Sequence, residues 1–169
     1  DTSPRSFTPP MAPRDRFDLD FEAIIARWQM TPRPVQELAE QLGVDEVALR
    51  RLDVVWAAEK RAWAFPMHDD RRAIVGIRLR ADNGAKFAIS GSHAGIFVPR
   101  GLESRPQLLI VEGPTDVAAA LTLGYDAIGR PSCTGGAGHI ANMLQVGRRR
   151  DVVIVADSDP PDAKTGQLE

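Results

Sequence analysis

Short apolar runs rich in β-branched residues recur in the second half of the chain. Residues 108–111 and 152–155 are two such runs, and each is followed by acidic residues. Runs of this length, closed by polar or turn-forming residues, are typical of strands buried on both faces. A helical pattern, a brief strand-like run at 127–129 and a second helical pattern separate them. This order of strand, helix, strand, helix, strand predicts a parallel sheet.

Three carboxylates follow the predicted strands. Glu112 comes after the first run, and Asp157 and Asp159 come after the last. Ligands of open parallel sheets gather at the carboxyl ends of the strands. Three converging carboxylates repel one another, and a bound divalent cation relieves that repulsion. The pattern therefore predicts a magnesium site, with Asp116 in the next predicted helix as a further carboxylate or simply a helix-dipole acid.

The first half of the chain has a different periodicity. Helical spacing covers residues 17–30 and 35–42, and a third short helix is predicted after Asp45. Residues 38–52 also match a helix-turn-helix that reads DNA, although packing of short amphipathic helices in a small bundle is the simpler interpretation. Short strand-like runs at 63–66, 74–80, 86–89 and 96–98 follow, separated by turn-forming clusters. They predict an antiparallel meander.

One predicted strand alternates apolar with basic residues. Ile77 and Leu79 alternate with Arg78 and Arg80, so one face of the sheet is expected to be apolar and the other basic. Lys86, directly after the next turn, is expected on the basic face. The alternative is that these cations are ordinary solvated strand residues.

A glycine-rich loop at 130–138 precedes the last predicted helix. Loops of this kind, feeding a helix N-terminus, cradle phosphate groups. Thr134 and Gly135 are its candidate nucleotide-binding residues. The loop lacks the lysine and hydroxyl ending of a Walker motif and the strict spacing of a dinucleotide fingerprint.

Composition excludes several classes of protein. The 169 residues are 43% hydrophobic and 26% charged, as in ordinary globular proteins, and the net charge of −2 does not itself indicate nucleic-acid binding. A single cysteine, Cys133, excludes an internal disulfide, and three scattered histidines exclude zinc-finger spacing. No apolar run approaches the roughly 18 residues of a membrane span, and no signal peptide is evident, so a cytoplasmic location is expected.

The acidic motifs resemble a known domain. Residues 112–116, with the sequence EGPTD, and residues 157–159, with the sequence DSD, resemble the toprim domain of bacterial primases, topoisomerases and some nucleases. The runs at 63–67, 74–80 and 95–99 resemble the subdomain that precedes toprim in bacterial and phage primases. The resemblance implies an α/β fold with a toprim-like parallel sheet flanked by helices, preceded by a small helical and antiparallel β subdomain.

The resemblance also implies domain boundaries. Residues 1–16, rich in proline, are expected to be a linker or arm. Residues 17–106 form the primase-core-like subdomain, and residues 107–169 form the toprim-like domain. We expect this domain to be incomplete at its C-terminus, because a full toprim sheet has a further helix and strand.

The implied activity is synthesis of RNA primers on single-stranded DNA from nucleoside triphosphates, with Mg²⁺ or Mn²⁺ as cofactor. Glu112 would be the acid–base group, and Asp157 and Asp159 would hold the metal with support from Asp116. The residues expected to face nucleotide or template are Arg78, Arg80 and Lys86. A replicative helicase is a further expected partner.

Two other classes of function remain open. A toprim-type metal-dependent nuclease uses the same acids, and the primase-like first half of the chain argues against it. A topoisomerase, of the same class, needs a catalytic tyrosine, and Tyr125 beside a predicted short strand is poorly placed for that role. The second class is a non-catalytic DNA-binding or recruitment module, which the complete set of acids argues against.

Overall fold

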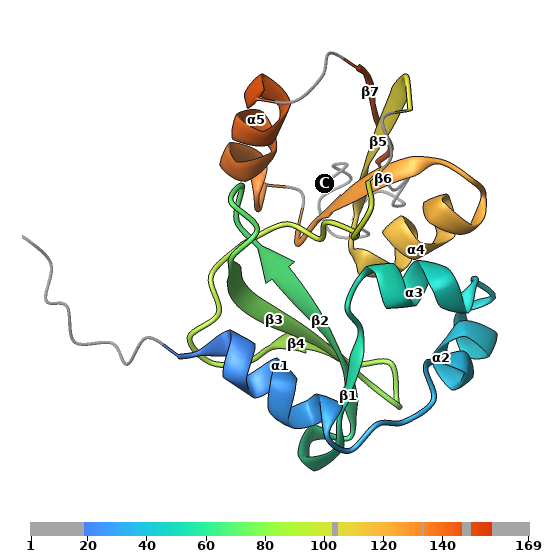
Figure 1. Cartoon of the computed structure of the whole chain (residues 1–169), viewed down its shortest axis with the longest axis vertical. Helices are drawn as coiled ribbons and strands as arrows, with labels where there is room; N and C mark the ends of the chain where they lie inside the picture. Colours follow the sequence, from blue (N-terminus) through green and yellow to red (C-terminus); the bar gives the residue numbers. More distant parts are fainter. Residues whose placement is uncertain (1–18, 103–104, 133, 147–149, 157–169) are drawn as a thin grey trace, which may run out of the picture.

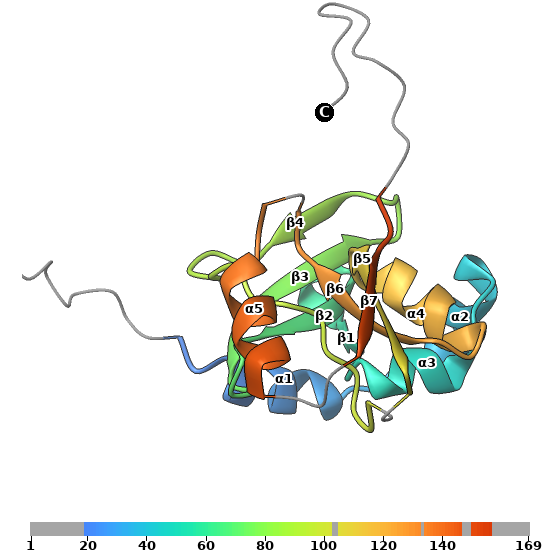
Figure 2. The same ribbon diagram turned by 90° about the horizontal axis from the view of Figure 1, so that it is seen from above.

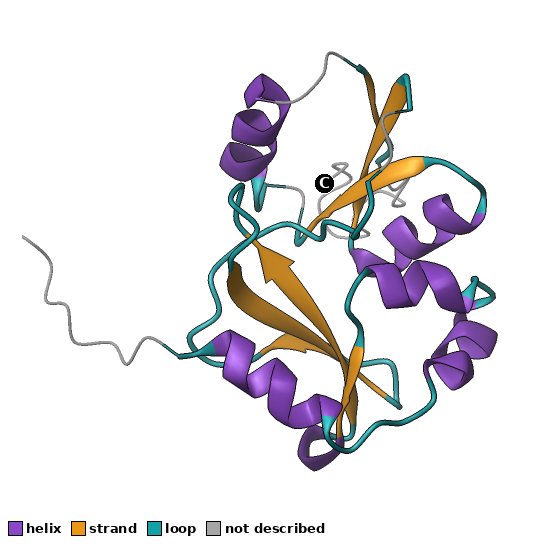
Figure 3. Ribbon diagram, in the orientation of Figure 1, coloured by secondary structure: helices purple, strands orange, loops and turns teal. Residues whose placement is uncertain are grey.

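The computed structural model describes residues 19–102, 105–132, 134–146 and 150–156. The first part of the chain contains α1 (Phe21–Gln29), α2 (Val35–Leu42), α3 (Glu46–Arg51), β1 (Val55–Ala57), a 3-10 turn (Ala58–Lys60), β2 (Ala62–His68), β3 (Ile74–Ala81) and β4 (Lys86–Ala88) (Figures 1 and 3). The second part contains β5 (Gln107–Glu112), α4 (Pro114–Thr122), β6 (Asp126–Arg130), α5 (Ala137–Val146) and β7 (Asp151–Ile154). None of the helices described is long and apolar enough to cross a bilayer.

The first sheet is an antiparallel meander in the order β1-β2-β3-β4. Helix α1 lies against one face (Figure 1), begins at the capping carboxylate of Asp20, and packs Phe21 and Ile25 into a core with Ile77 and Leu79. Ile77 and Leu79 are completely buried, which confirms the predicted apolar face of β3.

The second sheet is parallel, in the order β6-β5-β7. Helices α4 and α5 lie on opposite sides of it (Figure 2). Successive residues of a strand point to opposite faces of the sheet. Ile110 and Ile128 pack in one core with Ile140 of α5, and Val111 packs in another core with Val117 of α4. The α/β fold class predicted from the sequence is confirmed.

Strand β7 departs from its prediction. Its run of valines and isoleucine indicated a strand buried on both faces, but Val152, Val153 and Ile154 are 40%, 39% and 64% exposed. The reason is the strand order, which places β7 at an edge of the sheet, paired with β5 alone within the part of the chain that the structure describes. Apolar periodicity does not distinguish an edge strand from a central one.

Helices α2 and α3 join the two sheets. Leu38 and Leu49 are fully buried in a core that also contains Trp63 of β2 and Val117 of α4. At the end of α3, the side chain of Arg51 donates hydrogen bonds to the carbonyl oxygens of Arg100 and Gly101, at 2.9 and 2.6 Å. This packing supports the helical-bundle interpretation: the six-residue helix α3 buries Ala48 and Leu49, while Val47 and Arg50 on its other side are exposed.

The segment around Ile96 crosses between the sheets. The predicted strand at 96–98 forms only isolated bridges, from Ile96 to His68 of the first sheet and from Phe97 to Gly129 of the second. Gly129 permits this approach, since a Cβ atom there would lie 3.2 Å from the Phe97 ring, as well as 2.8 Å from the Val117 side chain. The segment therefore sets how closely the two sheets meet.

Candidate active site

A pocket of about 300 Å³ lies where the two sheets meet. The antiparallel sheet supplies one wall and the start of α4 supplies the other. The lining residues are Phe65, Arg78, Leu79, Arg80, Lys86, Glu112, Gly113, Pro114, Thr115, Asp116 and Pro131. Five of the residues predicted from the sequence are therefore brought together, from β3 and β4 on one side and the junction of β5 and α4 on the other: Arg78, Arg80, Lys86, Glu112 and Asp116.

Strand pairing explains the basic wall. Arg80 lies opposite Trp63 of β2 and Lys86 of β4, and directly paired residues of neighbouring antiparallel strands share a face of the sheet. Arg78 lies two residues before Arg80 and so projects from that face as well. Both arginines are half-buried, while Lys86 is exposed.

The acidic wall comes from the junction of β5 and α4. Glu112 is the last residue of β5, and Gly113 turns the chain into α4 with φ of 92°, a backbone conformation that favours glycine. Asp116 lies in the first turn of α4. Gly113 provides no side-chain cap, and the start of α4 is the positive end of the helix dipole.

The basic residues differ in their bonding. Within the described chain, the side chains of Arg80, Lys86 and Glu112 form no hydrogen bond or ion pair. Arg78, in contrast, donates a short hydrogen bond to the carbonyl oxygen of Pro131. Arg80 and Lys86 are thus available to a ligand, whereas the guanidinium of Arg78 already holds the opposite wall of the pocket.

The remaining predicted residues lie elsewhere. Thr134 is exposed and Gly135 half-buried, and neither lines the pocket, so their assignment to nucleotide binding stays a prediction. A Cβ atom at Gly135 would lie 2.6 Å from the Pro131 ring, which gives this glycine a packing role. Asp157 and Asp159 lie outside the described residues.

Of the predicted metal ligands, Asp116 lies at this pocket, while Asp157 and Asp159 lie outside the described residues. Among the residues described, no group of three or more His, Cys, Asp or Glu side chains is arranged to hold a metal ion. Glu112 and Asp116 supply two carboxylates to the pocket. Strand β7 runs in register beside β5, and the amide of Val155 donates to the carbonyl oxygen of Ile110 at 2.9 Å. Because the two strands are parallel, β7 runs toward the carboxyl end of β5, where Glu112 lies.

Sequence reasoning missed the residues that complete the pocket. Phe65 and Pro131 line it, and neither carries a chemical signal of its own. Pro131 directly follows β6, as Gly113 follows β5, so both residues lie at the carboxyl ends of the parallel strands. This shared position is the feature from which Pro131 could have been predicted as a pocket residue.

Comparison with known proteins identifies the fold. No protein-family model matches the chain, and no curated protein matches it by sequence. The DnaG primase catalytic domain bound to single-stranded DNA superposes with a TM-score of 0.61 at 17% identity, covering 82% of this chain and 60% of that one. The Escherichia coli primase catalytic core gives 0.57 at 16% identity, covering 81% and 61%.

A third match comes from Mycobacterium tuberculosis. The RNA polymerase domain of its primase DnaG, in complex with a double-stranded DNA oligomer with a 6-nucleotide overhang, gives a TM-score of 0.59 at 18% identity, covering 82% of this chain and 62% of that one. The chain therefore spans about 60% of the length of these structures. At these identities the likeness concerns the fold: the chain has the fold of the catalytic core of DnaG primases.

Proposed function

We propose that this chain carries the site of a primase-like nucleotidyltransferase, which synthesises RNA primers on single-stranded DNA. The observation that carries the proposal is the pocket in which Glu112 and Asp116 face the cations Arg80 and Lys86. Phosphoryl transfer needs cations for the phosphate oxygens and carboxylates for metal and proton, and this pocket combines both. The likeness in fold to primase cores supports the assignment.

Arg80 and Lys86 would bind the triphosphate of the incoming nucleotide. Their positions on neighbouring strands place two positive charges side by side, and the start of α4 adds the positive end of a helix dipole from the opposite wall. Together these groups would orient the α-phosphate toward the primer terminus. Glu112, half-buried at the end of β5, would accept the proton of the attacking 3′-hydroxyl.

Asp157 and Asp159, with support from Asp116, would hold Mg²⁺ or Mn²⁺. Carboxylate oxygens are the ligands that Mg²⁺ prefers, and the pocket already contains Asp116. A bound divalent ion would neutralise phosphate charge and lower the pKa of the attacking hydroxyl. The pairing of β7 with β5 supports this assignment, because Asp157 follows β7 by three residues along the chain.

The expected partners follow from this reaction. Single-stranded DNA would be the template and nucleoside triphosphates the substrates, and a DnaG catalytic domain of the same fold has been described bound to single-stranded DNA. A replicative helicase would be a further partner of the whole protein.

Calorimetric titration with Mn²⁺ tests the metal component. We expect the chain to bind Mn²⁺ saturably and the Asp157→Ala/Asp159→Ala variant to bind it at least about tenfold more weakly. An Asp151→Ala variant is the matched control, because this exposed acid is the first residue of β7 and lies at the amino ends of the parallel strands. Equal binding by the wild type and the double variant would place the metal elsewhere and contradict the assignment.

A further inference from the structure

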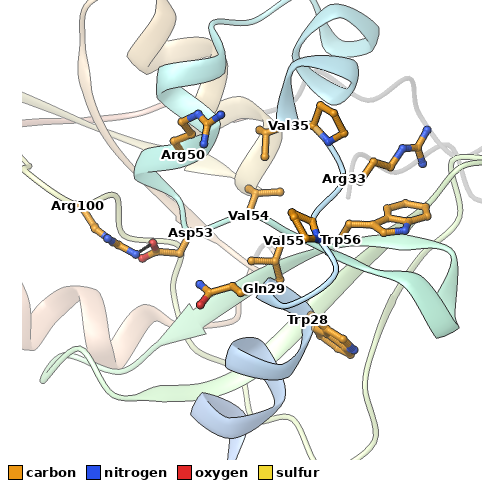
Figure 4. A pocket seen from close by; sticks show the side chains of 12 residues that line it. Trp28, Gln29, Arg33, Val35, Arg50, Asp53, Val54, Val55, Trp56 and Arg100 are labelled. Carbon is orange, nitrogen blue, oxygen red and sulfur yellow. Dashed lines mark ion pairs between the residues drawn. The ribbon is translucent and has the colours of Figure 1, made fainter.

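A second pocket, of about 520 Å³, lies among the N-terminal elements. It is bounded by the end of α1, the start of α2, the end of α3 and β1 (Figure 4), and it shares no lining residue with the candidate active site. Its volume falls in the range of small-molecule sites, roughly 300–1,000 Å³.

The lining of this pocket separates apolar from charged groups. Val35, Val54 and Val55 form an apolar middle (Figure 4), and each of them is at most 9% exposed. Arg50 and Arg100 both lie on one side of these valines, Arg100 beside Asp53 (Figure 4). The lining contains three arginines and one acid, Asp53, and the guanidinium groups are the donors that the pocket offers to an anionic ligand.

The opposite side of the pocket is a fixed aromatic wall. Trp56 lies there beneath Arg33, whose guanidinium carbon is 4.3 Å from the centre of the indole ring. Ion pairs from Arg33 to Glu37 and Asp82, at 2.7 and 3.1 Å, hold the guanidinium in place. Arg33 is therefore part of a rigid wall, and the cations open to a ligand are those on the other side.

Arg50 and Arg100 keep donors for a ligand. Their side chains are 64% and 70% exposed, with ion pairs to Glu46 and Asp53 respectively. Exposed pairs of this kind contribute little stability, and a guanidinium carries five N–H groups, so each arginine can bind a further acceptor. Phosphate is the anion that matches the fork geometry of arginine best.

The position of Arg100 is set in advance by α3. Its backbone amide donates to the carbonyl oxygen of Arg51 at 2.7 Å, and the Arg51 side chain donates back to the Arg100 carbonyl oxygen at 2.9 Å. Its ion-pair partner Asp53 follows the C-cap residue of α3 with φ of 55°, a left-handed conformation that Asp adopts more readily than most residues.

We propose that this pocket binds a nucleoside monophosphate, as a second nucleotide site separate from the candidate active site. The flat base would lie on the valines beside Trp56, and the phosphate would reach Arg50 and Arg100. A ligand with a planar aromatic ring at one end, whose face can pack on apolar side chains, and a phosphate dianion at the other fits this division of the lining. The proposal goes beyond the primase-like function and does not depend on it.

Tryptophan fluorescence reports on this pocket directly. All three tryptophans of the chain are involved, because Trp28 and Trp56 line the pocket and the Trp63 ring lies 5.2 Å from that of Trp56. The chain is titrated with AMP without divalent metal, with excitation at a wavelength that AMP does not absorb. We expect a saturable change in emission, and the Arg50→Glu variant should bind AMP at least about tenfold more weakly.

Two further variants distinguish binding in this pocket from binding elsewhere on the chain. Arg71→Glu makes the same change of charge at an exposed position outside the pocket and should bind AMP as the wild type does. Lys86→Ala, in the other pocket, should also leave the signal intact. The proposal is overturned if AMP gives no saturable change, if Arg50→Glu binds AMP normally, or if Lys86→Ala abolishes the signal. Adenosine binding as tightly as AMP would likewise overturn it.

Discussion

The guanidinium of Arg78 on β3 donates a hydrogen bond to the carbonyl oxygen of Pro131, the first residue after β6. This bond joins the antiparallel sheet to the parallel one across the candidate active site, since both residues line the pocket. Arg80 projects from the same face of β3 and has no such partner within the part of the chain described. Two arginines that look equivalent in the sequence therefore have different roles.

Substitution of Arg78 should reduce stability more than substitution of Arg80. Arg78→Ala leaves the Pro131 carbonyl without its charged donor, which should lower the free energy of unfolding by about 1–3 kcal/mol. Arg80→Ala removes no described bond and should change that free energy by less than about 0.5 kcal/mol. Urea denaturation of the two variants measures both values. Equal losses would mean that the Arg78–Pro131 bond does not contribute to stability.

Substitution of Lys86 should weaken ligand binding and leave stability nearly unchanged. Lys86→Ala removes a cation from the pocket, so the affinity for a nucleoside triphosphate in Mg²⁺ should fall about tenfold with little change in stability. Lys60→Ala, an exposed lysine outside this pocket, is the matched control. Equilibrium binding of a labelled, non-hydrolysable triphosphate gives the comparison. Equal affinities for the two variants would remove Lys86 from the site.

The turn before α5 should tolerate no side chain at Gly136. This residue has φ of 74°, and a Cβ atom there would lie 2.6 Å from the Ile96 side chain and 2.8 Å from the Gly95 carbonyl oxygen. Gly136→Ala should therefore cost more than about 3 kcal/mol in the free energy of unfolding, through backbone strain and overlap combined. Gly84→Ala, with φ of 85° and open space around it, should cost only about 1–2 kcal/mol. Thermal or urea unfolding that gives equal losses would contradict the close packing of this turn on Ile96.

His68 should make stability depend on pH. Burial lowers the pKa of its imidazole, and its Nδ1 atom has no hydrogen-bond partner among the described residues. The unfolded chain therefore binds a proton at higher pH than the folded chain does. Stability should be complete above the unfolded pKa of about 6.5 and decline as the pH falls below it.

The His68→Leu variant tests this dependence. Leucine suits the buried position and has no titrating group, so the decline in unfolding free energy between about pH 7.5 and pH 5.5 should be smaller than in the wild type. Urea unfolding at several pH values gives both curves. Parallel curves would show that other groups cause the acid sensitivity.

Local patterns predicted most of the elements. Helix α2 begins and ends at the predicted residues, because Val35, Leu38 and Leu42 follow helical spacing and Gly43 ends the helix in the left-handed conformation. The alternation in β3 correctly separated the buried Ile77 from the basic face. Strand β1 was missed, because three residues, Val55–Ala57, are too short to show a period.

Features that depend on contacts between distant segments of the chain could not be predicted from local sequence patterns. The periodicity of β7 is that of a central strand, yet its edge position depends on which strands pair with β5. The bond from Arg78 likewise depends on how the two sheets meet, since its two residues are 53 positions apart in the chain. In contrast, the proximity of Glu112 and Asp116 could be predicted, because Asp116 lies in the first turn of the helix that follows the strand ending at Glu112.

Incorporation of ribonucleotides tests the central claim most directly. The chain is incubated with a single-stranded DNA template, nucleoside triphosphates and Mg²⁺, and labelled RNA products are counted for the wild type, Glu112→Gln and Lys60→Ala. The account predicts products that require Mg²⁺, an unchanged yield for Lys60→Ala, and a rate for Glu112→Gln at least about a hundredfold lower, since general acid–base groups contribute about that much. Absence of RNA products from the wild type, or equal rates for the wild type and Glu112→Gln, would contradict it.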